Sequence, residues 1–571
     1  MTDSPATDAA TDLQALADEV WTGLMASQPL YATAIGNHRH LADLPPNDAA
    51  ALDREARRLA GQLERAGALP ADGLAPADRV TRDALLDLLA YELGVVESGI
   101  AAWSVDPLDG PQVQFLNVPS YQPVASPEQR EALVARWREM GPWIDRHVAG
   151  LREAAPDGLV APRALVDSVV DELDHLLATP DETWTLAAPA RAERPGWSDT
   201  DQQRFATAIG AAIRDGIRPA FERQRAYLAD ELRTLARPDD RAGLSHVPGG
   251  AEAYARLVAA HTTLDLDPEA IHAIGLEETA RIDAAFEALG GRLLGTRSMA
   301  ETMARLRDDP ELRFATRDEI RDTAQASLQR ANAAIPDWFG RLPQAPCVVV
   351  VMGDHESAHS TIAYYRDPAA DGSRPGSYYV NTTLPETRPR YEAEALAFHE
   401  AVPGHHLQIA IAQELTSLPA FRRFGGPTAF IEGWGLYSER LSHEMGLYSG
   451  PMDEFGILSF DAWRACRLVV DTGMHALGWT RRQAIDFMLA HTALGENNIV
   501  NEIDRYLATP GQALAYKMGQ REILALRAQA QAALGAAFDI RAFHDVVLGD
   551  GALGLKTLRG VVEDWVASTR A

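Results

Sequence analysis

Apolar residues recur at intervals of three and four positions along most of the first 240 residues, with charged residues between them. This spacing is typical of amphipathic helices. It is clear in residues 13–26, 81–100 and 130–151. We therefore predict that the first part of the chain is almost entirely helical.

Short interruptions rich in Pro and Gly divide this helical pattern. The one at residues 236–250, ARPDDRAGLSHVPGG, is the best candidate for a boundary between two lobes. Residues 1–12 are rich in Ala, Thr and Asp and are expected to fray. We predict an N-terminal helical lobe over residues 13–245 and a second lobe, which carries the candidate chemistry, over residues 246–571.

The pattern changes near the middle of the second lobe. Residues 345–354, 360–367 and 377–383 are rich in Val, Ile, Tyr and Thr, and Gly, Pro and Asp bound them. Such runs predict a small sheet of two or three strands. Helical spacing returns in residues 387–415 and again after residue 428. The predicted fold class is mainly α, with one small sheet beside the helix of residues 387–415.

Composition narrows the class of protein. The chain has 571 residues, 46% of them hydrophobic, and a formal net charge of -28. Such a chain can bury a large core, and its acidity argues against nucleic acid as a partner. The two cysteines, Cys347 and Cys466, lie far apart and do not indicate a disulfide framework. We find neither a signal peptide nor an apolar run long enough for a membrane span, and expect a cytoplasmic protein with no membrane partner. The oligomeric state is not indicated.

Two stretches combine His and Glu in ways that are typical of zinc sites. Residues 355–359 read HESAH, a complete HExxH motif, which requires a helix so that both imidazoles share one face. Strand-like segments flank this motif, so we interpret it as a loop and keep it as the alternative metal site. Residues 396–408 read LAFHEAVPGHHLQ, which breaks the motif but lies in a helical pattern. Their context favours residues 396–408.

Pro403 determines which histidines can share a metal ion with His399. It offers no N–H to the helix and crowds the carbonyl of His399, so we expect a bulge or kink. In an unbroken helix His406 would lie about 10 Å along the axis from His399, too far to share an ion. If a bulge absorbs two residues, His405 takes the place usually four residues after the first ligand. We predict His399 and His405 as ligands, with His406 beside the site, and the choice between His405 and His406 stays open.

A catalytic zinc site needs a third protein ligand and an open position for water. Glu432 lies on the amphipathic segment AFIEGWGLYSERL, residues 429–441, and is our candidate for that ligand; a solvated surface carboxylate is the alternative. Trp434 and Tyr437 are expected to pack this segment in place. Glu439 lies on the same face as Glu432 and is either a partner of a ligand or a surface charge.

Four ordered motifs carry a family resemblance: HEAVPGHHLQ, EGWGLYSERL, VVDTGMHALGWT and RYLATPGQALAYKMGQ. Together they resemble the bacterial domain-of-unknown-function 885 family over most of the chain, most strongly from about residue 340 to 530. That family looks like the gluzincin metallopeptidases, with a layout similar to the carboxypeptidase Taq, oligopeptidase and angiotensin-converting-enzyme groups. The resemblance implies two helical lobes flanking a deep channel. It also implies Glu400 as the general base and a zinc environment made of His399, the pair His405 and His406, and Glu432.

The remaining candidates follow from the chemistry of amide hydrolysis. Zinc bound in this way acidifies water and polarises the scissile carbonyl, and Glu400 can carry the proton to the leaving amine. His475 and Tyr516 are predicted to stabilise the oxyanion, with Asp471 orienting His475. The alternatives are a hydrogen-bonded buried histidine and an ordinary core tyrosine.

Two cationic residues, Arg505 and Lys517, are candidates to bind a substrate carboxylate, with surface charge as the alternative. His406 is grouped with them on the substrate side of the site. An edge of the strand GSYYVNT, residues 376–382, offers a second way to bind an extended peptide, unless this strand only shields the helix.

These features predict a zinc-dependent hydrolase that cleaves peptide bonds in short peptides. An amide hydrolase that acts on a small non-peptide metabolite would use the same site. A non-catalytic protein with a structural metal is the third hypothesis, and the presence of Glu400 disfavours it because a structural site needs no base.

Overall fold

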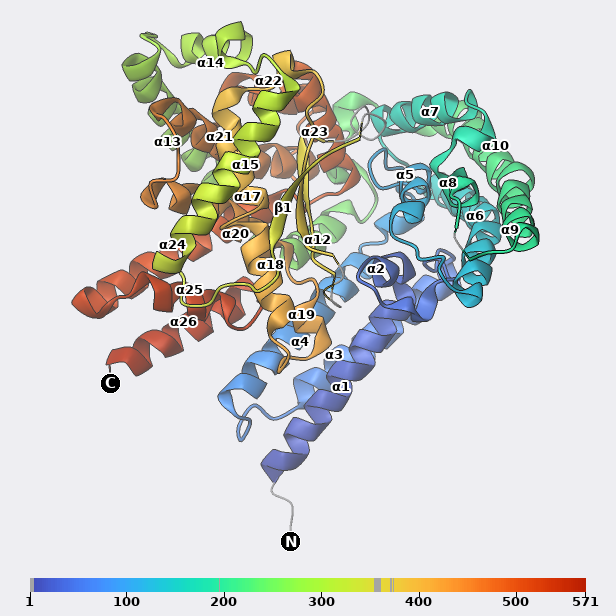
Figure 1. Ribbon diagram of the computed structural model, residues 1–571, viewed down its shortest axis with the longest axis horizontal. Helices are drawn as coiled ribbons and strands as arrows, with labels where there is room; N and C mark the ends of the chain where they lie inside the picture. The colour runs from blue at the N-terminus through green and yellow to red at the C-terminus, as the bar shows by residue number, and fades with distance from the viewer. Residues whose placement is uncertain (1–4, 195, 354–360, 370–371, 373, 571) are drawn as a thin grey trace.

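The computed structural model describes residues 5–194, 196–353, 361–369, 372 and 374–570, and the structural statements below concern these residues. In this part of the chain the architecture is mainly α-helical, with one small sheet near the middle of the molecule (Figure 1). The predicted fold class of a mainly α protein with a small sheet is confirmed.

The residues before the predicted boundary form a run of helices. The first begins upstream of the predicted start at residue 13. The start of α6 shows how the sequence sets these elements: Ser126 and Gln129 form a reciprocal capping box, and Pro127 occupies the first turn, where its missing N–H costs nothing. The helices are α1 (Pro5–Ser27), α2 (Pro29–Ala34), α3 (Ala49–Ala68), α4 (Pro76–Glu97), α5 (Pro111–Asn117), α6 (Pro127–Ala154), α7 (Arg163–Leu177), α8 (Ala188–Arg191), α9 (Asp199–Ala212), α10 (Arg218–Tyr227) and α11 (Arg233–Leu235).

The second part of the chain is also helical and surrounds the sheet. Its helices are α12 (Gly250–Thr262), α13 (Pro268–Leu293), α14 (Met299–Asp308), α15 (Arg317–Ala334), α17 (Ala393–Glu400), α18 (His405–Glu414), α19 (Ala420–Arg423), α20 (Thr428–Glu444), α21 (Glu454–His475), α22 (Arg481–His491), α23 (Glu496–Ala508), α24 (Leu514–Leu534), α25 (Ile540–Leu548) and α26 (Leu555–Arg570).

The sheet has three strands: β1 (Cys347–Val351), β2 (Ala363–Arg366) and β3 (Gly376–Val380). The strand order is β1-β3-β2, with β1 parallel and β2 antiparallel to β3. The strand GSYYV is therefore central and uses both of its edges within the sheet. The hypothesis that this strand offers a free edge to a peptide is wrong, because β1 and β2 occupy both sides.

Two large cores organise the helices. The larger one joins side chains of α1, α3 and α4 to side chains of the sheet and of α15, α17, α18, α20 and α24–α26. The second gathers residues between Val105 and Ala236, and its helices α5–α10 form the lobe at the right of Figure 1. The boundary near residue 245 stays a prediction, because shared cores show packing and not independent folding.

Helices α20 and α24 cross in near backbone contact. A Cβ atom added to Gly519 would lie 1.7 Å from the carbonyl oxygen of Ala429, and one added to Gly433 would lie 2.5 Å from the carbonyl carbon of Gly519. Only glycine fits at such a crossing. Glu432 directly precedes Gly433 on α20, so this close crossing places Glu432 next to the start of α24.

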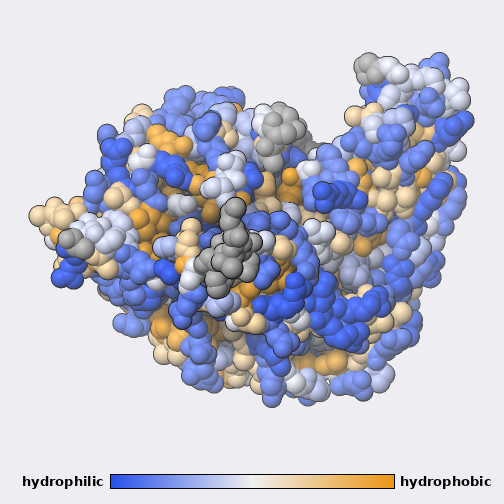
Figure 2. All heavy atoms as spheres, turned by 90° about the horizontal axis from the view of Figure 1, so that it is seen from below, coloured by the Kyte–Doolittle hydropathy of each residue, from blue (hydrophilic) through white to orange (hydrophobic). Residues whose placement is uncertain are grey.

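Figure 2 shows the molecule from below, with hydrophilic side chains over most of this face and a hollow between the main mass and the lobe at the right. Among the described residues, each helix is either too short or too polar to cross a lipid bilayer.

Candidate metal centre

The helical segment that carries the motif is broken in the middle. Helix α17 ends at Glu400 and α18 begins at His405. Across the break, the N–H of His406 donates to the carbonyl of Ala401 at 3.0 Å, which closes a turn one residue wider than an α-helical turn. A Cβ atom on Gly404 would lie 1.9 Å from the carbonyl oxygen of His399, so the turn requires glycine there. The kink expected from Pro403 is present.

The break brings together the three predicted ligands. Nε2 of His399 and Nε2 of His405 each lie 3.5 Å from Oε2 of Glu432, and one ligand atom from each of the three residues lies within 4.8 Å of the others. Ligand atoms about 2.0–2.1 Å from a tetrahedral zinc ion lie about 3.4 Å apart. Two imidazole nitrogens and one carboxylate at this spacing therefore fit zinc. We call His399, His405 and Glu432 the metal centre.

Neighbouring residues hold His399 in one orientation. Oε1 of Glu439 lies 2.8 Å from Nδ1 of His399, so the Nδ1–H donates to Glu439 and Nε2 faces the metal centre. A Cβ atom on Gly435 would lie 2.6 Å from Cε1 of His399, which explains the glycine at this position. Trp434 donates from Nε1 to the carbonyl of Pro403 at 2.9 Å and so ties α20 to the turn. The segment EGWG thus supplies a ligand, a brace for the turn and room for an imidazole.

Carboxylates dominate the electrostatics of the metal centre. Burial opposes a charge on His399, but hydrogen bonds with Glu432 and Glu439 outweigh burial and raise the pKa of His399 to about 9. Burial also acts against charge on Glu432, and the two histidines outweigh it and hold the pKa of Glu432 well below its usual range. Glu400, next to the first ligand, has its pKa raised by burial. A divalent cation would neutralise this concentration of negative charge.

His406 points away from the metal centre. Its Nε2 lies 3.0 Å from the carbonyl of Ala345, to which it donates, and its Nδ1 accepts from the hydroxyl of Tyr365 at 2.9 Å. Burial lowers the pKa of His406 to about 4. The prediction that His406 binds substrate is not supported, because both ring nitrogens anchor α18 to the sheet region.

His475 also makes structural contacts. Its Nδ1 accepts from the N–H of Leu244 at 3.2 Å, and its Nε2 donates to the carbonyl of Tyr506 at 3.0 Å. Asp471 does not orient it: this carboxylate accepts from the hydroxyl of Tyr254 at 2.5 Å and from the N–H of Gly511 at 3.1 Å. The predicted catalytic role of His475 is corrected, because the ring has no N–H left for an oxyanion.

The two cationic candidates are paired within the protein. Lys517 is buried in an ion pair with Asp461 and donates to Gln520 at 2.8 Å. Arg505 donates to Glu502 at 3.2 Å and to Gln512 at 2.9 Å. Both charges have carboxylate partners within the protein, which favours a structural role over binding of a substrate carboxylate, and both predictions are corrected.

Tyr516 lies close to the metal centre on the first turn of α24. The charge of Glu432 adds to burial in raising the pKa of Tyr516, which keeps its hydroxyl protonated as a donor. Its ring lies under two guanidinium groups, Arg467 at 4.3 Å and Arg464 at 5.9 Å from the ring centroid. Sequence reasoning missed Arg464 and Arg467, because the packing of α21 against α20 and α24 is not visible in the sequence.

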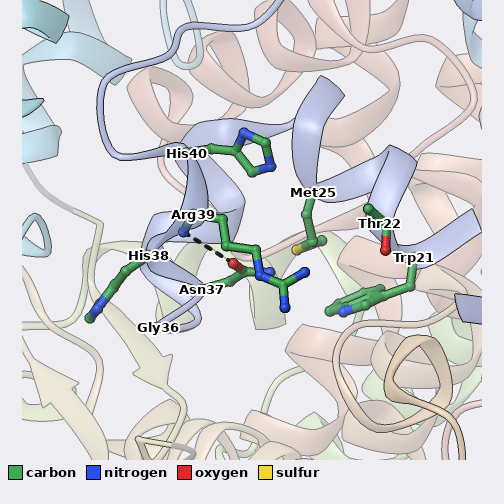
Figure 3. A pocket seen from close by; sticks show the side chains of 8 residues that line it. All are labelled: Trp21, Thr22, Met25, Gly36, Asn37, His38, Arg39 and His40. Atoms are coloured by element: carbon green, nitrogen blue, oxygen red, sulfur yellow. Dashed lines mark hydrogen bonds between the residues drawn. The ribbon is translucent and has the colours of Figure 1, made fainter. Parts of the chain in front are cut away.

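Two other features are the alternative motif in the sequence and a surface cavity. The HESAH motif, residues 355–359, falls outside the described residues. A cavity of about 540 Å³ lies beside α1. Figure 3 shows the side chains that line it, and there the N–H of Arg39 donates to Oδ1 of Asn37 at 3.3 Å. It is lined by Trp21, Thr22, Met25, Gly36, Asn37, His38, Arg39 and His40. No predicted site residue lines this cavity, so it is not part of the metal centre.

Comparisons with known proteins agree on a family and a fold. The profile of a family described as bacterial protein of unknown function (DUF885) matches residues 29–562. The crystal structure of a presumed lipoprotein from Colwellia psychrerythraea is similar at 26% identity and a TM-score of 0.91, covering 98% of this chain and 99% of that one. A presumed lipoprotein of unknown function from Shewanella oneidensis is similar in fold, with a TM-score of 0.74, 17% identity, and 96% and 99% of the two chains covered. No match was found among curated proteins.

Proposed function

The chain belongs to the bacterial family of proteins of unknown function DUF885, and we propose that within this family it is a zinc-dependent hydrolase of peptide bonds in short peptides. The observation that carries the proposal is the metal centre itself. Two imidazoles and a carboxylate converge at ligand spacing, and a further glutamate, Glu400, directly follows the first ligand.

The number of ligands supports catalysis over a structural role. Structural zinc sites are closed by four protein ligands, whereas catalytic sites use three and keep one position open. Within the described part of the chain, the cluster contains three residues. His406, the obvious fourth candidate, uses both ring nitrogens elsewhere. Glu432 keeps 20% of its side chain exposed, so the centre is reachable from solvent.

Zinc in this centre would polarise the scissile carbonyl and make a water molecule more acidic. Glu400 has the properties of the base in such a reaction. Burial raises the pKa of its carboxyl, which makes the carboxylate a better proton acceptor. The hydroxyl of Tyr516 is the candidate donor to the oxygen that gains negative charge, as predicted from the sequence.

Short peptides and small non-peptide amides present the same reacting group, so the metabolite hypothesis differs only in substrate. We keep the predicted cytoplasmic location as a proposal that localisation in the native cell would test, since both related structures are of presumed lipoproteins.

Metal analysis combined with a peptide-library digest tests this function. We expect one zinc per chain in the wild type, in Glu400→Gln and in the control Glu496→Gln, which changes an exposed glutamate on α23. Peptide cleavage should fall by about 10²- to 10⁴-fold in Glu400→Gln alone, the usual contribution of a general base.

Three results would argue against parts of the proposal. A wild-type chain that binds no zinc would refute the metal centre. Normal cleavage by Glu400→Gln would remove Glu400 from the reaction. Zinc without peptide cleavage in the wild type would favour a small non-peptide amide as the substrate.

A further inference from the structure

Arg464 is a buried cation without a partner. Only 6% of the residue is exposed. In the part of the chain that the structure describes, its Nε and Nη1 have no hydrogen-bond partner, and no ion pair includes it. Burying an unpaired charge costs several kcal/mol or more, so such groups are paired or serve a ligand.

The packing of α21 explains where this guanidinium lies. Asp461 lies one turn before Arg464 on the same face of α21. It contacts Arg440 of α20 and Lys517 of α24, so this face of α21 packs against both helices. The guanidinium carbon of Arg464 lies 4.4 Å from the ring centroid of Trp463. It also lies 5.9 Å from the ring centroid of Tyr516. Aromatic faces therefore hold the plane of the guanidinium, while the N–H groups at its edge remain to bind an anion.

Arg464 is also close to the metal centre. Its charge interacts with Glu432 and Glu439 of α20, and it opposes the effect of burial on the pKa of Glu400. The carboxylates of Glu432 and Glu439 are engaged by the imidazoles of the metal centre. Their nearest charged partners are these histidines, and among the described residues neither carboxylate forms an ion pair or a hydrogen bond with Arg464.

The neighbouring cations differ from Arg464 in this respect. Arg467 donates to Glu502 at 3.0 Å and to the hydroxyl of Tyr506 at 2.8 Å. Arg505 donates to the same Glu502 at 3.2 Å. One carboxylate thus serves both of these arginines, and Arg464 is the cation near the centre that is left for an outside anion.

We propose that Arg464 binds the free carboxylate of a peptide whose C-terminal amide bond lies at the metal centre, so that the enzyme removes residues from the C-terminus. This inference rests on the proposed function. A guanidinium fork matches a carboxylate with two parallel N–H···O bonds, and a buried fork makes that pairing strong. In the reaction, the oxygen of water bonds to the carbonyl carbon, the C–N bond breaks, and the amine nitrogen takes up a proton. The products are the shortened peptide and one free amino acid.

The test compares two substrates that differ only at the C-terminus. One is the acetylated tripeptide acetyl-Ala-Ala-Phe with a free carboxylate, and the other is its C-terminal amide. The wild type should cleave the free acid with a kcat/KM about 10- to 100-fold higher, the usual value of a hydrogen-bonded ion pair. Arg464→Gln should remove this preference mainly through KM. Arg464→Lys should restore part of it, and the control Arg482→Gln, an exposed arginine on α22, should leave it unchanged.

Other results would overturn the inference. Equal cleavage of acid and amide by the wild type, or an unchanged preference in Arg464→Gln, excludes carboxylate binding by Arg464. An equal loss of kcat on both substrates would place Arg464 at the oxyanion instead. Zinc content and the melting temperature of each variant separate these outcomes from misfolding.

The inference stays testable if the wild type hydrolyses neither peptide. That result would contradict the proposed function but not carboxylate binding. Calorimetric titration of the zinc-loaded wild type with the same acid and amide then gives the answer. We expect the acid to bind about 10- to 100-fold more tightly, and Arg464→Gln to abolish the difference. Identical dissociation constants for acid and amide would refute the inference.

Discussion

Two buried groups of charges include residues of α20 and α21, and they differ in whether every charge has a partner inside the protein. The first, which we call the Asp461 cluster, consists of the carboxylates Asp461 and Glu278 and the cations Lys517, Arg440, Arg281 and Arg521. Asp461 contacts Lys517 and Arg440, and Lys517 also lies 3.3 Å from Glu278. The second is the metal centre with Arg464 beside it. There, two carboxylates face two imidazoles, and Arg464 faces no counter-ion among the described residues.

The difference distinguishes charges with a structural role from charges that we propose to be functional, although α20 and α21 contribute to both groups. A buried charge that has its partner inside the protein fixes the helices relative to each other. A buried charge without a partner lowers the stability of the isolated chain. A bound ligand of opposite charge removes this cost. The Asp461 cluster is of the first kind. The carboxylates of the metal centre need a cation to balance their charge, and the guanidinium of Arg464 needs an anion.

The largest effect should come from removing a ligand, and adjacent histidines provide a matched pair. His405→Ala should abolish stoichiometric zinc binding, since loss of an outer partner alone already costs about 10- to 100-fold in affinity. His406→Ala should keep its zinc but lower the free energy of unfolding by about 1–3 kcal/mol for the lost hydrogen bonds to Tyr365 and Ala345. Metal content and thermal melting of both variants check this. The reverse pattern would show that His406 is the ligand.

Breaking the complete cluster should affect stability and not metal binding. Lys517→Met keeps the length of the side chain but removes the most buried of the cations that pair with Asp461 and Glu278. Removing one member of a buried pair costs about 3–5 kcal/mol, so we expect a lower melting temperature and urea midpoint with unchanged zinc content. Lys556→Met, an exposed lysine on α26, is the control. Loss of zinc by a folded Lys517→Met would break the distinction between the two groups.

Much of this arrangement followed from local rules. Helical spacing predicted the fold class, and the missing N–H of Pro403 predicted the interruption that lets His405, two residues beyond the usual position, approach His399. The structure places Glu432 with them, on a helix far along the chain. These inferences depend on residues close in sequence or on a motif with a narrow chemical meaning.

The residues that were misassigned depend on long-range partners. His475 looked catalytic in sequence, but the backbone of Leu244 and of Tyr506 satisfies both of its nitrogens. Lys517 was predicted to bind a substrate carboxylate, but in the structure it forms an ion pair with Asp461. Arg464 cannot be singled out from the sequence. A buried charge without a hydrogen-bond partner is recognised only when the positions of all its neighbours are known. The sequence pattern does not show which side chains pair across helices that lie far apart in the chain.

The smallest effect should come from the residue that links the metal centre to the protein around it. Glu439 accepts from Nδ1 of His399 at 2.8 Å and is buried. Glu439→Gln keeps the shape and an acceptor oxygen but removes the negative charge, so zinc affinity should fall by about 10- to 100-fold, or about 1.4–2.7 kcal/mol. Competition titrations with a zinc chelator measure this, with Glu444→Gln, farther along α20, as the control. If Glu439→Gln binds zinc as tightly as that control, a neutral hydrogen bond is enough to orient His399, and the charge of Glu439 belongs with the structural group.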